Sequence, residues 1–420
     1  MKRRKSIISL LIVMCLMSMS LCGCSKPGQN DEVEEPTEDI IAEENTDEFI
    51  ALAEDSYQER AIARGRNLSR IQKVMERAAN GEAITIGFIG GSITMGSGAS
   101  SSSKCYAELV FDWWVETFPE ADFTFINAGI GATDSKFACA RCEDDLLQYN
   151  PDFVIVEFSV NDSSDQTFSE SYESLVRKIL TYETEPAVML LNMVTYDTGY
   201  SAQDIHNVIA FRYDIPAVSM KNSIYADIEA GILQAKDVSS DMTHPNDRGH
   251  AYAAQIVTYF LEKVRLQGFP EDYYTDYVLP DPVNNLISIT SSRLRNDTLQ
   301  AELNGFAADM QEQNSITDVF RRGYEAYTEG DSISFTVEGS VIMLQYRKTK
   351  DMTAPTAMVI IDGDEENAIT VDGNYPNGWG DWLYLDTVYR GTSGIHSVEI
   401  RLTSTGTKSF YLVSVVTAGQ

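Results

Sequence analysis

Three side chains far apart in the sequence have the types and the order needed for nucleophilic catalysis. Asp241 lies three residues before His244, and Ser92 lies much earlier, in a glycine-rich segment. A serine hydroxyl is a poor nucleophile until an imidazole accepts its proton, and the imidazole works best when a carboxylate fixes its tautomer. The chain has only four histidines. The pattern therefore predicts a serine hydrolase with Ser92 as nucleophile, His244 as base and Asp241 as the orienting carboxylate.

Alternating strands and helices are predicted to position these side chains. Apolar runs indicate strands at 84–89, 123–127, 153–158, 187–194 and 217–219, and helical periodicity indicates helices at 59–80, 105–118, 137–149, 169–181, 201–213 and 249–266. This alternation predicts a parallel sheet covered by helices on both faces. Ligands bind at the carboxyl ends of such strands. We therefore expect Ser92, Asn127 and Asn161, which follow predicted strands, to share one edge.

The chain changes character after Gly268. Beyond about residue 285 the apolar runs are short, rich in β-branched and aromatic residues, and separated by Gly, Asp and Asn turns. Such runs predict an antiparallel β-sandwich, jelly-roll-like, over 285–420. Trp379 and Trp382 lie in a Gly/Asn-rich segment of it, where aromatic rings could contact a sugar or pack in the core. Asp362 and Asp364 could bind calcium, although the chain has no EF-hand-like loop.

The N-terminus has the pattern of a processing signal. A basic start, an apolar run over 7–19 and Leu21-Cys22-Gly23-Cys24 resemble a bacterial lipoprotein signal peptide, residues 1–23, with lipid attachment at Cys24. An ordinary secretory signal is the alternative. Residues 24–57 are predicted to form an acidic, disordered tether, because twelve Asp and Glu lie between Asp31 and Asp55 with no Lys or Arg. The resemblance implies a location on the extracellular face of the cell membrane of a Gram-positive-like bacterium.

Composition restricts the partners. The formal net charge is −31, and neither a basic patch nor aromatic–basic interleaving is present, so nucleic acid is an improbable ligand. The same charge favours a neutral substrate over a polyanionic one. Three cysteines, Cys105, Cys139 and Cys142, remain beside Cys24 after signal removal. We interpret Cys139 and Cys142 as small buried hydrophobic residues, with a disulfide or a metal role as the alternative.

Four short blocks, taken together, resemble the SGNH/GDSL hydrolases. They are Gly90-Gly91-Ser92-Ile93-Thr94, Asn127-Ala128-Gly129-Ile130-Gly131-Ala132, Ser159-Val160-Asn161-Asp162 and Asp241-Met242-Thr243-His244-Pro245. Two positions depart from the family pattern: Gly91 stands where Asp is commoner, and Ser159 replaces a glycine. The missing final glycine of a Gly-x-Ser-x-Gly elbow argues against the α/β-hydrolase class. The resemblance covers roughly 84–265 and implies a flavodoxin-like, three-layer α/β/α domain over 58–270.

The resemblance also implies roles for the residues of these blocks. The backbone amides of Ser92 and Gly131 and the side chain of Asn161 are the expected oxyanion donors, with Ala132 as an alternative register for Gly131. No metal or organic cofactor is implied. Similarity to two-domain carbohydrate esterases suggests removal of O-acetyl groups from a polysaccharide or oligosaccharide. A lipolytic esterase or thioesterase, and a non-catalytic glycan-binding lipoprotein, are the alternatives.

The remaining polar candidates have weaker patterns. His250, six residues after His244, is expected to be a structural helix residue facing the sheet edge. His206 and His396 have no informative spacing. Glu157 ends an apolar strand, where an unpaired carboxylate would be costly, and the sequence indicates no partner for it.

Overall fold

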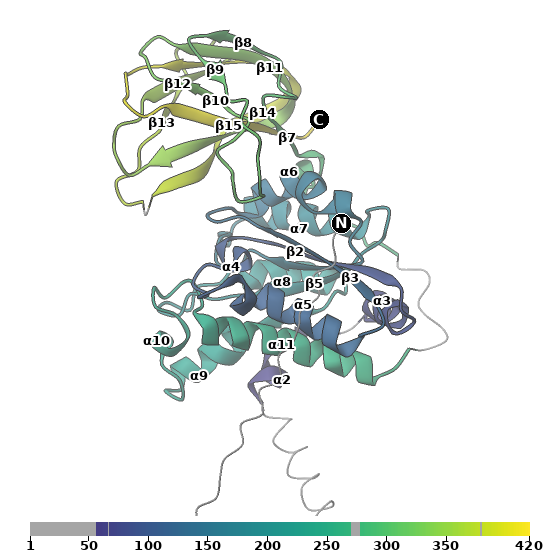
Figure 1. Cartoon of the computed structure of the whole chain (residues 1–420). Helices are drawn as coiled ribbons and strands as arrows, with labels where there is room; N and C mark the ends of the chain where they lie inside the picture. The colour runs from purple at the N-terminus through teal and green to yellow at the C-terminus, as the bar shows by residue number, and fades with distance from the viewer. Residues whose placement is uncertain (1–55, 66, 270–277, 379) are drawn as a thin grey trace, which may run out of the picture. The chain divides into compact units, whose positions relative to one another are not determined.

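The computed structural model describes residues 56–65, 67–269, 278–378 and 380–420 (Figure 1). All of them belong to one compact unit, Leu52–Gln420. The predicted signal peptide, the lipid attachment at Cys24 and nearly all of the predicted tether lie outside the described residues. Those assignments stay predictions.

The first part of the described chain is a three-layer α/β/α fold around a six-stranded sheet. Its strands are β1 (Ile62–Arg64), β2 (Ala83–Gly90), β3 (Asp122–Gly129), β4 (Phe153–Glu157), β5 (Ala187–Asn192) and β6 (Ala217–Ser219). Their order across the sheet is β1-β6-β5-β4-β2-β3. The ladders from β3 to β6 are parallel, whereas β1 is antiparallel to β6. Parallel strands are buried on both faces, and for this reason they read as continuous apolar runs.

Helices cover both faces of this sheet. The principal ones are α2 (Tyr57–Ala61), α3 (Ser69–Ala79), α4 (Ser92–Met95), α5 (Tyr106–Thr117), α6 (Ser135–Asp145), α7 (Gln166–Leu180), α8 (Gln203–Arg212), α9 (Ala226–Glu229), α10 (Ala235–Val238) and α11 (Asp247–Leu266). One apolar core joins α3, α5 and α11 to the sheet, and a second joins α6, α7 and α8 to the opposite face. The predicted α/β fold class is confirmed.

One predicted element is wrong. The periodicity over 59–80 predicts a single helix, but the chain forms α2, then β1, then α3. Ile62 and Arg64 pair with Val218 and Ala217 of β6. Without β1, the outer edge of β6 would be open. Pairing with β1 satisfies the backbone groups at that edge, which a continuous helix over 59–80 would leave unpaired. A local periodicity carries no information about that distant partner.

The C-terminal part is an antiparallel β structure, as predicted. Its strands are β7 (Ser292–Leu294), β8 (Ala301–Asn304), β9 (Ala307–Ala308), β10 (Tyr324–Ala326), β11 (Ser332–Thr349), β12 (Thr356–Ile361), β13 (Ile369–Asp372), β14 (Asp381–Leu402) and β15 (Phe410–Ala418). They form one nine-stranded hydrogen-bonded sheet. The long strands β11 and β14 pair with each other along nearly their whole length, with a register shift between Gly339 and Val341. Buried apolar side chains of these strands and their neighbours form the core.

The two parts share a packed junction at α6 and α7. A third apolar cluster contains Ile130, Phe137 and Ala140 together with residues of β11, β14 and β15. Polar contacts add to it: the buried Glu173 carboxylate accepts hydrogen bonds from the backbone amides of Val283 and Asn284, both at 2.7 Å. The α/β layers and the C-terminal sheet therefore pack on each other directly.

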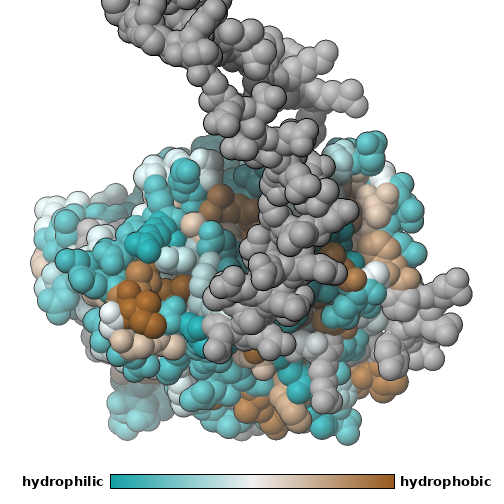
Figure 2. Space-filling view, turned by 90° about the horizontal axis from the view of Figure 1, so that it is seen from below, coloured by the Kyte–Doolittle hydropathy of each residue, from teal (hydrophilic) through white to brown (hydrophobic). Residues whose placement is uncertain are grey.

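The described surface is predominantly hydrophilic. Figure 2 shows one face on which hydrophobic residues form separate groups among polar ones. Among the described residues, no helix has the length and apolarity needed to cross a bilayer.

The packing of α4 on β3 gives a test of the fold. A Cβ atom at Gly129 would lie 2.3 Å from the backbone nitrogen of Met95. We expect Gly129→Ala to lower the free energy of unfolding by about 1–3 kcal/mol, because backbone must move to admit the methyl group. Urea unfolding of the whole chain measures this. Gly394→Ala in β14 is the control, since a Cβ at that strand glycine meets open space; equal effects of the two substitutions would contradict the prediction.

Candidate active site

Ser92 lies at the carboxyl edge of the parallel sheet. It is the first residue of α4, directly after β2. Two glycines let this short helix approach the strands: a Cβ at Gly90 would lie 2.0 Å from the Thr94 hydroxyl, and Gly129 contacts the helix backbone. The Asn127 side chain donates to the Thr94 carbonyl at 2.8 Å. Close packing of α4 on the strands, together with this hydrogen bond, therefore holds Ser92 at the edge of the sheet.

His244 and Asp241 meet Ser92 from the loop that precedes α11. Ser92 Oγ lies 2.8 Å from His244 Nε2, and His244 Nδ1 lies 2.6 Å from Asp241 Oδ2. The Ser239 hydroxyl donates to the His244 carbonyl at 2.7 Å and holds the loop. Met242 adopts φ +69° between the two residues. The structure thus brings together all three side chains that the sequence singles out first.

Hydrogen bonds keep Asp241 ionised. Its Oδ1 accepts from the backbone amides of Thr243 (3.0 Å) and His244 (2.7 Å), and its Oδ2 faces the imidazole. Partial burial by itself would raise the pKa of the Asp241 carboxyl. The hydrogen bonds from the His244 ring and from the two amides outweigh burial and lower that pKa to about 2. Asp241 is therefore a carboxylate throughout the neutral range.

Asn161 lies against the residue that precedes the serine. A Cβ at Gly91 would lie 2.4 Å from Asn161 Oδ1 and 3.3 Å from Nδ2. In this arrangement any side chain at position 91 would displace the Asn161 amide. Among the described residues, Asn161 Oδ1 has no hydrogen-bond partner although it is buried. The amide is thus held by packing beside Ser92.

Gly131 is the nearer of the two candidate oxyanion residues of the second block. A Cβ at Gly131 would lie 3.9 Å from Ser92 Cβ. Ala132, the alternative, adopts φ +57° and lines an adjacent cavity instead. This placement favours Gly131 as the backbone donor.

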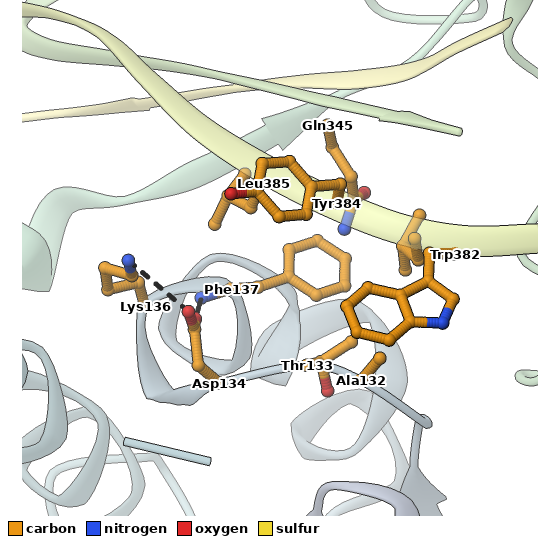
Figure 3. A pocket seen from close by; sticks show the side chains of 10 residues that line it. Ala132, Thr133, Asp134, Lys136, Phe137, Gln345, Trp382, Tyr384 and Leu385 are labelled. Carbon is orange, nitrogen blue, oxygen red and sulfur yellow. Dashed lines mark hydrogen bonds and ion pairs between the residues drawn. The ribbon is translucent and has the colours of Figure 1, made fainter. Parts of the chain in front are cut away.

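A cavity of about 220 Å³ opens beside this loop (Figure 3). Ala132, Thr133 and Phe137 line it from the α/β part, and Gln345, Trp382 and Leu385 are among the residues that line it from β11 and β14. Figure 3 shows the Trp382 indole next to Ala132 and Thr133, with the Phe137 ring toward the sheet. Of the two predicted glycan contacts, Trp382 therefore lies near the oxyanion loop. Trp379 lies outside the described residues.

Two residues that sequence analysis did not connect lie behind the nucleophile. Glu157 is fully buried, and the Thr94 hydroxyl donates to its Oε2 at 3.1 Å. Tyr106 Oη lies 2.8 Å from the same hydroxyl. The sequence alone could not show that these residues are linked. The link depends on the pairing of β2 with β4, which places Gly90 opposite Glu157.

The other sequence candidates have structural contacts. His250 is buried, accepts from the Tyr106 amide and bonds the Ser97 carbonyl, in agreement with a structural role. His206 contacts Asp162 at 3.1 Å, and His396 contacts Asp362 at 2.7 Å within the C-terminal sheet. The thiols of Cys105, Cys139 and Cys142 are buried and unbridged. Within the described part of the chain, no three His, Cys, Asp or Glu side chains converge as a metal site.

Comparisons with known proteins agree with this geometry. Residues 88–252 match the GDSL-like lipase/acylhydrolase family. The solved structure of a two-domain esterase active on acetylated mannans matches with a TM-score of 0.84 and 47% identity, over 86% of this chain and 98% of that one. A structure of such an esterase co-crystallised with mannopentaose matches with a TM-score of 0.82 and the same identity and coverage. A search of curated proteins found no significant match.

An α/β/α sheet with a serine, a histidine and an aspartate at its carboxyl edge defines an SGNH-type hydrolase. The chain belongs to the GDSL-like lipase/acylhydrolase family. Like the acetylmannan esterase that it matches over nearly the whole of that protein, it couples the hydrolase fold to a C-terminal antiparallel sheet. It is a carboxylic ester hydrolase.

The contact between Gly91 and Asn161 can be tested by a double-mutant cycle. Asn161→Ala should lower kcat by about 10²–10³-fold if the amide is an oxyanion donor. Gly91→Ala should cause a loss of similar size, because its methyl group displaces the same amide. The double variant should then be hardly worse than Asn161→Ala alone, since both changes remove one interaction. Steady-state kinetics on a nitrophenyl ester measure this, and fully multiplicative losses would show that the two residues act independently.

Proposed function

We propose that this chain is a serine esterase that removes O-acetyl groups from neutral polysaccharide or oligosaccharide, with acetylated mannan as the first substrate to test. The observation that carries the proposal is the hydrogen-bonded series from Ser92 through His244 to Asp241, at 2.8 and 2.6 Å. It lies beside a cavity that an aromatic side chain of the C-terminal sheet helps to form. The 47% identical esterases active on acetylated mannans support the substrate class.

The chemistry follows from where the protons can go. Ser92 Oγ attacks the acetyl carbonyl while its proton passes to His244 Nε2, and Asp241 stabilises the imidazolium. The tetrahedral intermediate collapses, its bond to the sugar oxygen breaks, and His244 returns the proton to that oxygen. Water then attacks the acetyl-serine, with His244 accepting its proton. Acetate leaves, and Ser92 regains its hydroxyl hydrogen from His244.

Preorganised donors stabilise the negative oxygen of both tetrahedral intermediates. The backbone amides of Ser92 and Gly131 and the Asn161 side-chain amide approach from three different segments of the chain. Because these groups are fixed before the substrate arrives, no reorganisation is needed when charge develops. Asn161 makes no hydrogen bond to a described side chain that would have to break first.

The cavity next to the oxyanion loop suits an uncharged sugar. Trp382 and Tyr384 contribute aromatic surface, Thr133 and Gln345 contribute neutral polar groups, and the charges of Asp134 and Lys136 pair with each other. Aromatic faces bind the apolar faces of sugar rings, and polar groups fix their orientation. With a formal net charge of −31, the protein repels polyanionic chains, which supports a neutral acetylated glycan.

Acetate release tests the reaction directly. The mature chain should liberate acetate from acetylated mannan, and Ser92→Ala should lower the rate by on the order of 10⁶-fold, because the nucleophile is lost. Acetate is measured by an enzyme-coupled assay, with acetylated xylan and nitrophenyl esters of increasing acyl length in parallel. Preference for long acyl chains would identify a lipolytic enzyme instead. Absence of any Ser92-dependent turnover would leave only a glycan-binding role.

Trp382 gives a test of how the glycan is held. Trp382→Ala should raise KM for acetylated oligosaccharides by roughly two- to tenfold, the contribution of one aromatic contact. It should leave kcat/KM for nitrophenyl acetate nearly unchanged, since that ester is too small to reach the ring. Tyr327→Ala removes an exposed aromatic side chain that follows β10 and does not line the cavity, and it is the control. Equal losses on both kinds of substrate would argue against a glycan contact.

A further inference from the structure

Glu157 is a fully buried carboxyl group that the acetyl-transfer chemistry does not use. It ends β4 and points to the face where Phe153 and Ile155 join the core of α3, α5 and α11. Its register partner in β2 is Gly90, two residues before the nucleophile. Since Gly90 has no side chain, Thr94 can lie over β2 and reach across to the carboxyl.

A hydrogen-bond relay joins this carboxyl to the nucleophile helix. Thr94 donates to Glu157 Oε2 at 3.1 Å, which leaves Tyr106 Oη, 2.8 Å away, to donate to Thr94. The Thr94 carbonyl accepts separately from Asn127. Helix α4 has only four residues, Ser92–Met95. A helix so short has little stability of its own, so these anchors decide where Ser92 points.

The surroundings of Glu157 favour its uncharged form. Burial, with a smaller contribution from the nearby Asp162 carboxylate, raises the pKa of Glu157 from 4.5 to about 8, although Thr94 and the Gly91 amide partly stabilise the ion. The other titratable groups facing it are Cys105, which precedes α5, Tyr106 of α5, Tyr172 of α7 and Tyr196 after β5. Burial raises the pKa of each of these thiol and phenol groups, so they stay neutral where Glu157 titrates.

The neighbouring charged groups do not neutralise an ionised Glu157. Arg141 of α6 donates to the Gly90 carbonyl at 3.2 Å, but its guanidinium pairs with Asp145. His250, stacked on Tyr106 at 6.3 Å, is bonded to backbone through both ring nitrogens, and burial lowers its pKa. Among the described residues, Glu157 Oε1 has no hydrogen-bond partner. An ionised Glu157 would therefore be a poorly compensated negative charge.

We propose that Glu157 is a positioning residue of this esterase, whose uncharged carboxyl anchors the Ser92 helix through Thr94 and whose ionisation sets the alkaline limit of activity. The inference rests on the proposed esterase function. Ionisation of Glu157 places a negative charge behind the turn that must stabilise the negative oxygen of the tetrahedral intermediate. In a buried site such a charge is screened little by solvent, so it disfavours the transition state.

The same proton links Glu157 to stability. In the unfolded chain Glu157 loses its proton near pH 4.5, whereas in the folded chain it keeps the proton up to about pH 8. The folded state therefore binds the extra proton between these values, and its stability decreases as pH rises through that window. Glu157→Gln, which cannot ionise, should lose less stability over the same range.

The decisive measurement is the pH dependence of kcat/KM for nitrophenyl acetate, from about pH 5 to about pH 10. The wild type should lose activity on an alkaline limb with a midpoint near 8, the pKa of Glu157. Glu157→Gln keeps an acceptor for Thr94 and should lack this limb. Glu157→Ala removes both the anchor and the ionisable group, so it should lower kcat/KM by roughly tenfold below the alkaline limb, about the effect of one lost hydrogen bond, and should also lack that limb.

Thr94→Val gives an independent readout that does not require Glu157 to be replaced. Losing the hydroxyl removes a bond that stabilises the ionised carboxyl, so the alkaline limb should move to higher pH while the rate falls. If Thr94 served only to hold the fold, replacing it would lower the rate without moving the alkaline limb. Glu173→Gln, at another fully buried glutamate, is the matched control for general destabilisation and should keep the wild-type profile.

The outcomes separate this inference from the proposed function. A wild type without Ser92-dependent turnover would refute the esterase itself. An active wild type whose alkaline limb is unchanged in both Glu157→Gln and Thr94→Val would overturn the role of Glu157 alone.

Discussion

The whole site depends on how closely a four-residue helix can approach the end of a parallel sheet. Helix α4 lies on β2 and β3 because Gly90 and Gly129 leave no side chain in between; a Cβ at either position would lie within 2.3 Å of α4 atoms. Gly91 extends the same requirement to Asn161. The position of Ser92 thus depends on the close approach of α4 to β2 and β3, together with the hydrogen bonds that Thr94 and Asn127 make there. This is why a serine without a strained elbow motif can still be held 2.8 Å from its base.

Asp241 and Glu157, two carboxyl groups of the site, favour opposite protonation states because their surroundings differ. Asp241 is about half exposed, and three hydrogen bonds from amides and imidazole lower its pKa to about 2. Glu157 is fully buried, the Thr94 hydroxyl and the Gly91 amide stabilise its ion only in part, and burial raises its pKa to about 8. Differences in solvation and in donor number separate groups of nearly the same intrinsic acidity. The carboxyl of Asp241 faces the His244 imidazole, and that of Glu157 lies behind the Ser92 helix.

Much of this arrangement could be predicted from the sequence, and the exceptions share one cause. The strands from β2 to β6 were predictable because burial on both faces makes their apolar runs continuous. Ser92, Asp241 and His244 were predictable because short blocks carry them. The helix predicted over 59–80 was wrong because β1 depends on a distant edge strand. The partner of Glu157, the contact of Gly91 with Asn161 and the position of Trp382 next to Ala132 all require the register between segments far apart in the chain, which periodicity does not encode.

Helix α6 connects the oxyanion loop to the C-terminal sheet. Gly131 and Ala132 precede it, the buried Asp162 carboxylate accepts from the Ser135 amide at 2.9 Å in its first turn, and Phe137 and Ala140 pack into the cluster shared with β11, β14 and β15. Any displacement of that sheet would move the helix whose preceding loop supplies an oxyanion donor. Because packed interfaces transmit small shifts instead of absorbing them, the C-terminal sheet supports the geometry of the hydrolase site as well as lining its cavity. An isolated α/β domain would therefore lack both a wall of this cavity and the packing that supports α6.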